Sequence, residues 1–350
     1  MRKLVCMLLV AFLLVGCSKD EKKVQDNEPK ENNVEEKTDP PKATEEFENI
    51  YPLTGMGTNN AVDNKIVSVM VNNHPSARPQ SGLSKADIVF EILAEGQITR
   101  LLAFYQSEMP VVVGPVRSSR EYYFELANMY QALYVYHGAA NFINDMIKNR
   151  GIEHLDGAIY DNDGNLFKRE SFRKAPHNSY LQFGAAYDVA EGKGYETTAE
   201  YEPLAFLAAD ELSDLSGDPA EQAEIAYSKN AIYNVEYKYD DSTEKYTRFS
   251  NQEETVELDT GDLIELDNIF IIETSHQVID DAGRRAIDLL SGGDAYLIQK
   301  GIVQEVQWET RDGRVIPVRD GKPIGLVPGK TWINVIPANP GLQQTVTITN

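Results

Sequence analysis

Two arginines in the first half of the chain have a spacing that could bind an anion. In GPVRSSREYYF, Arg117 and Arg120 flank Ser118, and Ser118 with Glu121 forms the S-x-x-E pattern of a helix capping box. The free N–H groups at a helix start favour an anion, and arginines there add forked donors for a carboxylate or phosphate. We predict an anion site at Arg117, Ser118 and Arg120. The alternative is that both arginines pair with neighbouring acidic residues of the protein.

Glu95 is the candidate for catalysis. It stands beside Gly96, between two apolar runs that read as the strands of a hairpin. Side chains at strand ends often carry function on a rigid scaffold. Burial against neighbouring aromatic residues would raise the pKa of the Glu95 carboxyl toward that of a general acid, which could cleave glycan as in lytic transglycosylases. The alternative is a solvated hairpin tip.

The same hairpin assigns a structural role to a second glutamate. If Glu95 and Gly96 are the two central residues of a tight turn, the register places Glu91 directly opposite Arg100. A cross-strand Glu–Arg pair is a structural brace. We therefore predict that Glu91 and Arg100 form a structural pair, which leaves Glu95 free for function.

Three more residues are expected around the same site. His74 and Arg78 lie in the loop NNHPSARPQSG, whose prolines exclude a helix, and His137 ends the apolar run ALYVY. Strand ends and the starts of following helices share one edge of an α/β sheet, so we predict one cleft that joins His137 to Glu95 and the arginine pair, with His74 and Arg78 at its edge. The histidines lack the spacing of a zinc site, and the sequence predicts no metal and no cofactor.

These residues are carried by a chain that changes character near its middle. Residues 50–192 alternate expected strands and helices and predict an α/β N-terminal domain, residues 193–223 predict a linker, and residues 224–350 predict a mainly antiparallel β domain. The fold class is therefore α+β. The expected N-terminal strands are 65–73, 86–94, 97–106 and 132–139, with helices at 120–131, 142–150 and 180–192; the expected C-terminal strands are 230–240, 267–274, 294–301, 302–310 and 331–338.

The N-terminus predicts where the protein resides. Residues 1–16 combine two basic residues with an apolar run too short to span a bilayer, as in a signal peptide. They end in Leu-Val-Gly before Cys17, which is typical of a lipobox, where cleavage would leave Cys17 as the lipidated first residue. Residues 17–49 are rich in charge and poor in apolar side chains, and predict a disordered acidic tether.

The charge of the chain excludes one class of partner. Loss of Arg2 and Lys3 with the signal lowers the 33 basic residues to 31, against 55 acidic ones, and leaves a net charge near −24. So acidic a protein is a poor candidate for binding nucleic acid. Any anion site must be a local group of arginines that acts against the overall charge.

Several motifs together resemble a known family. VNNHPSARPQSGLSKADIVFE, EGQITRLLAFYQ and GPVRSSR in the first half, and YTRFSN and PVRDGKPIGLVPGKTWINVIP in the second, are similar to the YerB-type lipoproteins. This bacterial family has two uncharacterised domains behind a lipobox. The resemblance implies a cell-envelope protein connected to wall metabolism and brings no established catalytic residues.

Two functions remain open from the sequence. In the first, a lipid on Cys17 anchors the protein outside the membrane, where it binds cell-wall glycan or a wall-synthesis protein as a scaffold or regulator. In the second, it is a peptidoglycan-cleaving enzyme that uses Glu95. Release of soluble muropeptides from peptidoglycan distinguishes the two.

Overall fold

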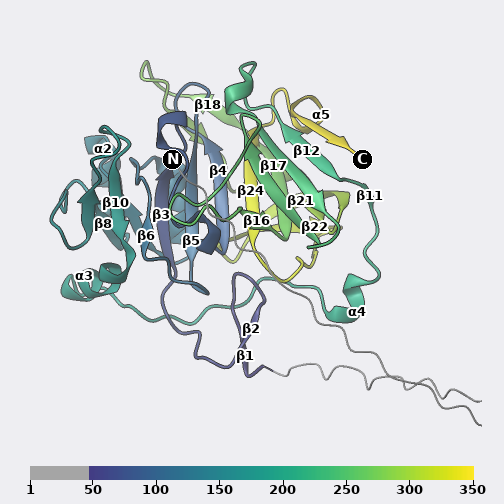
Figure 1. Cartoon of the computed structure of the whole chain (residues 1–350), viewed down its shortest axis with the longest axis horizontal. Coiled ribbons are helices and arrows are strands. Elements are labelled where there is room, and N and C mark those ends of the chain that lie inside the picture. Colours follow the sequence, from purple (N-terminus) through teal and green to yellow (C-terminus); the bar gives the residue numbers. More distant parts are fainter. Residues whose placement is uncertain (1–46) are drawn as a thin grey trace, which may run out of the picture. The chain divides into compact units, whose positions relative to one another are not determined.

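The apolar runs predicted as strands form the centre of one large mixed sheet (Figure 1). The structure is a computed structural model and describes residues 47–350, which form a single compact unit. The predicted signal peptide, Cys17 and nearly all of the predicted tether lie outside the described residues. Within the described residues, no helix combines the length and apolarity needed to cross a membrane.

The large sheet has twelve strands, eleven of them in one continuous order. That order is β23 (Lys322–Pro323), β22 (Arg314–Arg319), β21 (Ile302–Arg311), β20 (Gly293–Gln299), β17 (Asn268–Thr274), β24 (Thr331–Pro337), β4 (Ile88–Leu93), β5 (Thr99–Tyr105), β3 (Val67–Asn72), β7 (Leu133–Tyr136) and β8 (His154–Asp156), and β11 (Asp218–Pro219) pairs with β21. Most neighbours are antiparallel. The mixed first half and mainly antiparallel second half confirm the predicted fold class.

Strand β24 connects the two halves of the sheet. It pairs in parallel with β17 on one side and with β4 on the other. Residues from both predicted domains therefore share one set of backbone hydrogen bonds. The boundaries at 192 and 224 stay a prediction.

Smaller sheets cover parts of this centre. A six-stranded sheet contains β15 (Glu253–Glu254), β14 (Lys245–Ser250), β13 (Val235–Asp240), β12 (Gln222–Ile225) and β25 (Val346–Thr349), with β16 (Glu265–Leu266) paired to β14. A three-stranded sheet contains β6 (Val112–Val113), β10 (Ser179–Gln182) and β9 (Phe167–Arg169). Two-stranded pairs are β1 (Asn49–Ile50) with β2 (Gly57–Thr58), and β18 (His276–Val278) with β19 (Arg285–Ile287).

The helices are few and short. They are α1 (Glu121–Met129), α2 (Asn141–Asn149), α3 (Ala186–Gly192), α4 (Ala209–Leu212) and α5 (Leu342–Thr345), with 3₁₀ turns η1 (Pro75–Ala77), η2 (Leu83–Lys85), η3 (Phe183–Ala185) and η4 (Ala231–Tyr233). Figure 1 shows α2 and α3 at the β8 end of the large sheet. The expected helix over 180–192 is partly wrong, because its first residues pair as β10 with β6 and β9.

Both faces of the large sheet are buried. Along β5, Ala103 belongs to the core on the side of the six-stranded sheet, together with Tyr237 and Tyr246. Leu102, the next residue, belongs to the core under α1, together with Tyr123. This alternation explains why the central strands read as continuous apolar runs.

The hairpin of β4 and β5 differs from the prediction by one residue. Its loop holds three residues, since Leu93 pairs with Thr99 and the Ala94 N–H donates to the Ile98 carbonyl at 2.8 Å. Arg100 therefore lies opposite Ile92, and Glu91 lies opposite Leu101. A shift of one residue turns a side chain to the other face of the sheet. The predicted Glu91–Arg100 pair is wrong for this reason.

Candidate functional site

Three segments meet at the end of β3 and bring cationic side chains together. Asn72 donates its N–H to the carbonyl of Pro115 at 2.8 Å, and Arg117 donates its N–H to the carbonyl of Met70 at the same distance. Val116 in turn donates to the carbonyl of Ser179 at 2.7 Å. The loop after β3, the segment before α1 and the segment before β10 are therefore neighbours.

We call the group formed there the histidine–arginine patch: His74, His177, Arg78, Arg117 and Arg173. The rings of His74 and His177 stack with centroids 4.6 Å apart. Asn72 lies against His177, with its Nδ2 atom 2.9 Å from Nδ1 of the ring. Arg173 donates to the carbonyl of Pro79 at 2.6 Å, which ties the His177 segment to the loop that contains Arg78.

The arginines of the patch lack acidic partners. In residues 47–350, none of Arg78, Arg117 and Arg173 has a carboxylate oxygen within 4.0 Å. Burial, and then the charges of Arg100 and Arg120, lower the pKa of Arg117. Burial and the charge of Arg248 lower the pKa of Arg78 to about 10. In a chain with a net charge of −22, partly buried arginines without carboxylates are the arrangement expected of an anion site.

Glu95 lies next to this patch but is already bound. It accepts hydrogen bonds from Arg100 at 2.8 Å and from Arg120. Burial alone would raise the pKa of Glu95, but the hydrogen bond from Arg120 and the charges of both arginines lower it below its ordinary value. The expectation of a raised pKa is wrong. An ionised carboxylate held by two arginines is poorly suited to donate a proton.

The start of α1 also differs from the prediction. Its N-cap is Arg120, with no side-chain cap, so the capping box of Ser118 and Glu121 is wrong. The Ser118 carbonyl instead accepts from Arg100 at 2.7 Å. The adjacent Ser119 hydroxyl accepts from Tyr134 at 2.7 Å. The arginines are thus positioned by contacts to the sheet rather than by a capped helix start.

His137 is joined to the site through its backbone. Its N–H donates to the carbonyl of Arg117 at 3.0 Å. Its ring lies 3.4 Å from Asp161, between Nε2 and Oδ1, and packs edge-on against Phe167. The role of His137 as a ligand residue stays a prediction, and its ring already has protein contacts.

Glu91 is the centre of a separate, fully buried network. Its carboxylate accepts from Arg248 at 2.9 Å, from Trp332 at 3.0 Å, and from Asn73 and Thr99 at 3.0 and 2.8 Å. The Arg248 guanidinium also lies over the Trp332 ring, 4.7 Å from its centroid. This network joins β4, β14 and β24. Glu91 is structural, as predicted, with a different partner.

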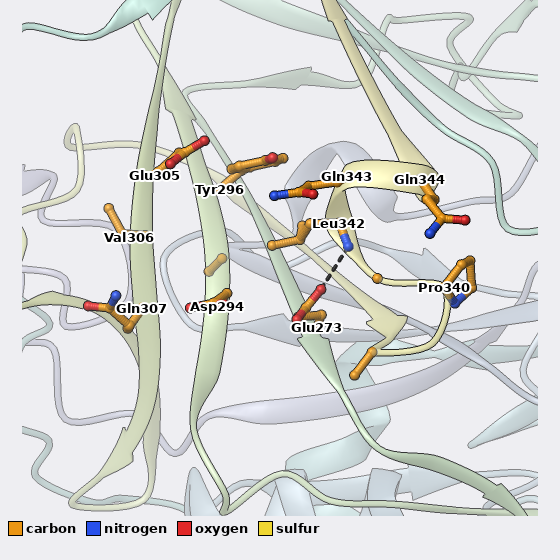
Figure 2. A pocket seen from close by; sticks show the side chains of 13 residues that line it. Glu273, Asp294, Tyr296, Glu305, Val306, Gln307, Pro340, Leu342, Gln343 and Gln344 are labelled. Carbon is orange, nitrogen blue, oxygen red and sulfur yellow. Dashed lines mark hydrogen bonds between the residues drawn. The ribbon is translucent and has the colours of Figure 1, made fainter.

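A hollow elsewhere on the molecule has the opposite charge (Figure 2). Its volume is about 470 Å³, and Glu273, Asp294, Glu305 and Tyr296 line it. Glu273 accepts from the Leu342 N–H at 2.7 Å, the contact drawn in Figure 2. In residues 47–350, no three His, Cys, Asp or Glu side chains are arranged to hold a metal ion. An acidic wall of this kind would repel an anionic ligand.

Sequence reasoning missed two members of the patch. His177 and Arg173 lie about 100 residues after His74 and carry no local motif. They reach the patch because β10 pairs with β6 and the segment before β10 lies against Val116. Only this long-range pairing identifies them.

Comparisons with known proteins identify related sequences over both halves of the chain. Residues 53–196 match the model described as "Protein of unknown function (DUF3048) N-terminal domain", and residues 223–333 match the corresponding C-terminal domain. The chain is 47% identical over 291 residues to "Putative lipoprotein YerB" of Bacillus subtilis (strain 168), which covers 82% of this chain and 86% of that protein.

A solved structure is also similar. The crystal structure of the YerB protein from Bacillus subtilis matches with a TM-score of 0.79 and 44% sequence identity, over 86% of this chain and 99% of that one. The two matched domains contain the residues of the patch and the Glu91 network. The chain belongs to the DUF3048 family of YerB-type proteins.

Proposed function

We propose that this protein is a membrane-anchored extracytoplasmic lipoprotein that binds an anionic cell-wall polymer through the histidine–arginine patch. The lipobox before Cys17 and a relative named as a lipoprotein support the anchor. An extracytoplasmic protein meets carboxylates and phosphates of the wall as its most abundant fixed anions. Binding there suits a scaffold or regulatory role in envelope metabolism.

One observation carries the proposal. Arg117 is partly buried beside Arg100 and Arg120, and the one carboxylate in this group, Glu95, is bound by the other two. Like charges at close range destabilise a folded protein, so the arrangement is costly without an anion to balance it. A bound ligand oxyanion would remove that cost and fill the free donors of Arg117.

The alternative of glycan cleavage has less support. It needs a protonated Glu95, and both arginine contacts favour the ionised form. A test for soluble muropeptides after incubation with peptidoglycan keeps the two functions apart. We expect none to be released by the wild-type protein.

The binding test uses the soluble chain that begins after Cys17, sedimented with purified cell walls at low salt. We expect wild type to co-sediment and Arg117→Ala to bind about 10- to 100-fold more weakly, since a charge-assisted hydrogen bond contributes about 1.5–3 kcal/mol. Arg117→Ala with Arg120→Ala should abolish binding.

The matched control is Arg319→Ala. Arg319 is exposed on β22, far from β3 in the strand order, and its loss changes the net charge equally. It should bind walls as wild type does. Equal binding by Arg117→Ala and Arg319→Ala would rule out the patch as the site. Wall binding restored only by added wall-synthesis protein would point to a protein partner instead.

A further inference from the structure

The protonation of the two stacked histidines can be read from their hydrogen bonds. Nδ1 of His74 accepts from the backbone N–H of Ser76 at 3.1 Å. A backbone N–H can only donate, so Nδ1 carries no proton. The proton of the neutral His74 ring is therefore on Nε2.

The same argument applies to His177 through Asn72. The Oδ1 atom of Asn72 accepts from the backbone N–H of His74 at 3.0 Å, which fixes the orientation of the Asn72 amide. Its Nδ2 group then faces Nδ1 of His177 at 2.9 Å and donates to it. The neutral His177 ring also carries its proton on Nε2.

Both Nε2–H groups are left with no acceptor from the protein. Within the described part of the chain, neither Nε2 atom has a hydrogen-bond partner, and both rings are only partly buried. They stack face to face at an interplanar angle of 26°. Each of the two stacked rings thus has an Nε2–H donor without a protein acceptor among these residues, and the charge of Arg117 acts on both rings.

Their surroundings keep the rings neutral. Burial and then the charges of Arg117 and Arg78 lower the pKa of His74. Burial, His74, Arg117 and Arg173 lower the pKa of His177. In residues 47–350, the charged groups that act on the ring pair are the arginines Arg78, Arg117 and Arg173, with no carboxylate among them. A neutral N–H adds a donor for an anion without adding repulsion to a crowded cationic site.

We propose that His74 and His177 bind an oxyanion of the ligand through their Nε2–H groups, as neutral donors beside the positive Arg117. The ligand group is a phosphate or carboxylate of a wall polymer, whose oxygens are pure acceptors. Arg78 and Arg173 add positive charge near the pair, but both already donate to protein acceptors: Arg78 to Asn73, and Arg173 to Tyr180 and Pro79. This assignment rests on the proposed function, because it names the groups that recognise the ligand at that site.

The first test reads the tautomer directly. We expect ring ¹⁵N spectra of the free protein at pH 7.5 to show both histidines protonated at Nε2. Titration with inorganic phosphate should shift the Nε2–H signals in wild type and leave them unchanged in Arg117→Ala. A proton on Nδ1 in either ring, or no shift at saturating phosphate, overturns the proposal.

The second test removes the outward donors and keeps the internal contacts. In His74→Asn and His177→Asn, the new Oδ1 can still accept from Ser76 N–H or Asn72 Nδ2. The new Nδ2 group takes the place of ring Cδ2 and ends short of the Nε2 position, so the donor at that position is lost. We expect the double variant to keep its melting temperature and to bind walls about tenfold more weakly, as expected for two neutral hydrogen bonds. His177→Phe, which keeps only the ring stack, should bind no better than His177→Asn.

The outcomes separate the two proposals. If Arg117→Ala loses wall binding and the double asparagine variant does not, the proposed function stands and the histidine assignment fails. If wild type does not bind walls at all, the proposed function fails and the phosphate titration alone decides the assignment. Walls stripped of phosphodiester polymers with hydrofluoric acid identify the source: lost binding assigns phosphate, and retained binding assigns the carboxylates of peptidoglycan.

Discussion

Two glutamates four residues apart on one hairpin have opposite surroundings. Glu91 is fully buried, and all of its hydrogen-bond donors come from the protein. Glu95 is partly exposed, and its arginine partners belong to a group that includes Arg117, which has no carboxylate oxygen of the described residues within 4.0 Å. The Glu91 site is buried, and the donors that bind its carboxylate come from the protein. The Glu95 site has more arginine donors than protein acceptors.

The comparison distinguishes a charge that stabilises the fold from a charge that, under the proposed function, binds a ligand. A buried ion pair tolerates no missing partner, because a lone buried charge is strongly destabilising. A partly exposed arginine can remain unpaired because water solvates it until a ligand arrives. Mutations in the Glu91 network should therefore affect folding, and mutations in the histidine–arginine patch should affect binding.

The largest expected effect comes from the Glu91 site. Arg248→Met leaves Glu91 buried without its charge partner and should lower the free energy of unfolding by about 3–5 kcal/mol. Urea denaturation measures this change. Adding Glu91→Gln should recover part of the loss, because no buried charge then remains. Equal stability of Arg248→Met and wild type would show that the network is not structural.

Another buried carboxylate, that of Asp87, extends the comparison because no arginine of the described chain binds it. Asp87 accepts from Gln106 N–H at 2.6 Å and from Ser107, and burial raises its pKa to about 6. The raised pKa means that the folded state holds the proton more tightly than the unfolded state does. Its contribution to stability is therefore present below about pH 4 and is lost as the pH rises to about 6.

The corresponding variant is Asp87→Asn, which keeps one acceptor oxygen and cannot ionise. We expect its stability relative to wild type to increase between pH 4 and 7 by up to about 3 kcal/mol, at roughly 1.4 kcal/mol per pKa unit. Thermal melts of both proteins across this range give the difference. A constant difference across this range would mean that folding does not raise the pKa of Asp87.

Arg117→Ala should affect wall binding much more than the stability of the protein. We expect the free energy of unfolding to stay within about 0.5 kcal/mol of wild type or to rise, since the side chain lacks an acidic partner and its removal relieves repulsion from neighbouring arginines. The loss of wall binding should nevertheless be at least tenfold. A variant that unfolds more easily than Arg319→Ala would place Arg117 with the structural charges.

The smallest expected effect is a gain. Glu95→Gln removes the carboxylate that neutralises Arg100 and Arg120, so both become available to the ligand and wall binding should strengthen a few-fold. Because folding lowers the pKa of Glu95, its ionised form stabilises the folded protein above the unfolded pKa. This stabilisation is lost as the pH falls through the folded pKa. Glu95→Gln should lack this pH dependence of stability. Weaker binding would place Glu95 among the ligand contacts.

Sequence patterns predicted the positions of the strands and helices better than the contacts between them. The strands β3, β4 and β5 and helices α1 and α2 lie where the apolar patterns predicted them. The hairpin register failed because a loop of two or of three residues is compatible with the letters AEGQ, and one residue decides the face of every following side chain.

The residues of the proposed anion site were partly predictable. Arg117 and Arg120 could be found from their spacing at a helix start, although the capping geometry was wrong. Arg173 and His177 depend on the pairing of β10, and Arg248 and Trp332 reach Glu91 from over 150 residues away. No local pattern encodes contacts of that separation, since they arise only when distant strands pack together.

Because β24 lies in the middle of the large sheet, the sheet can form completely only after this strand has been added. This strand comes from nearly the last residues of the chain, yet it lies between β17 and β4 in the middle of the sheet. Until it arrives, β4 presents an unpaired apolar edge that could bind other extended chains. Contacts between distant segments form slowly. In a chain exported from its N-terminus, this edge of β4 would therefore stay open until residues 331–337 have crossed the membrane.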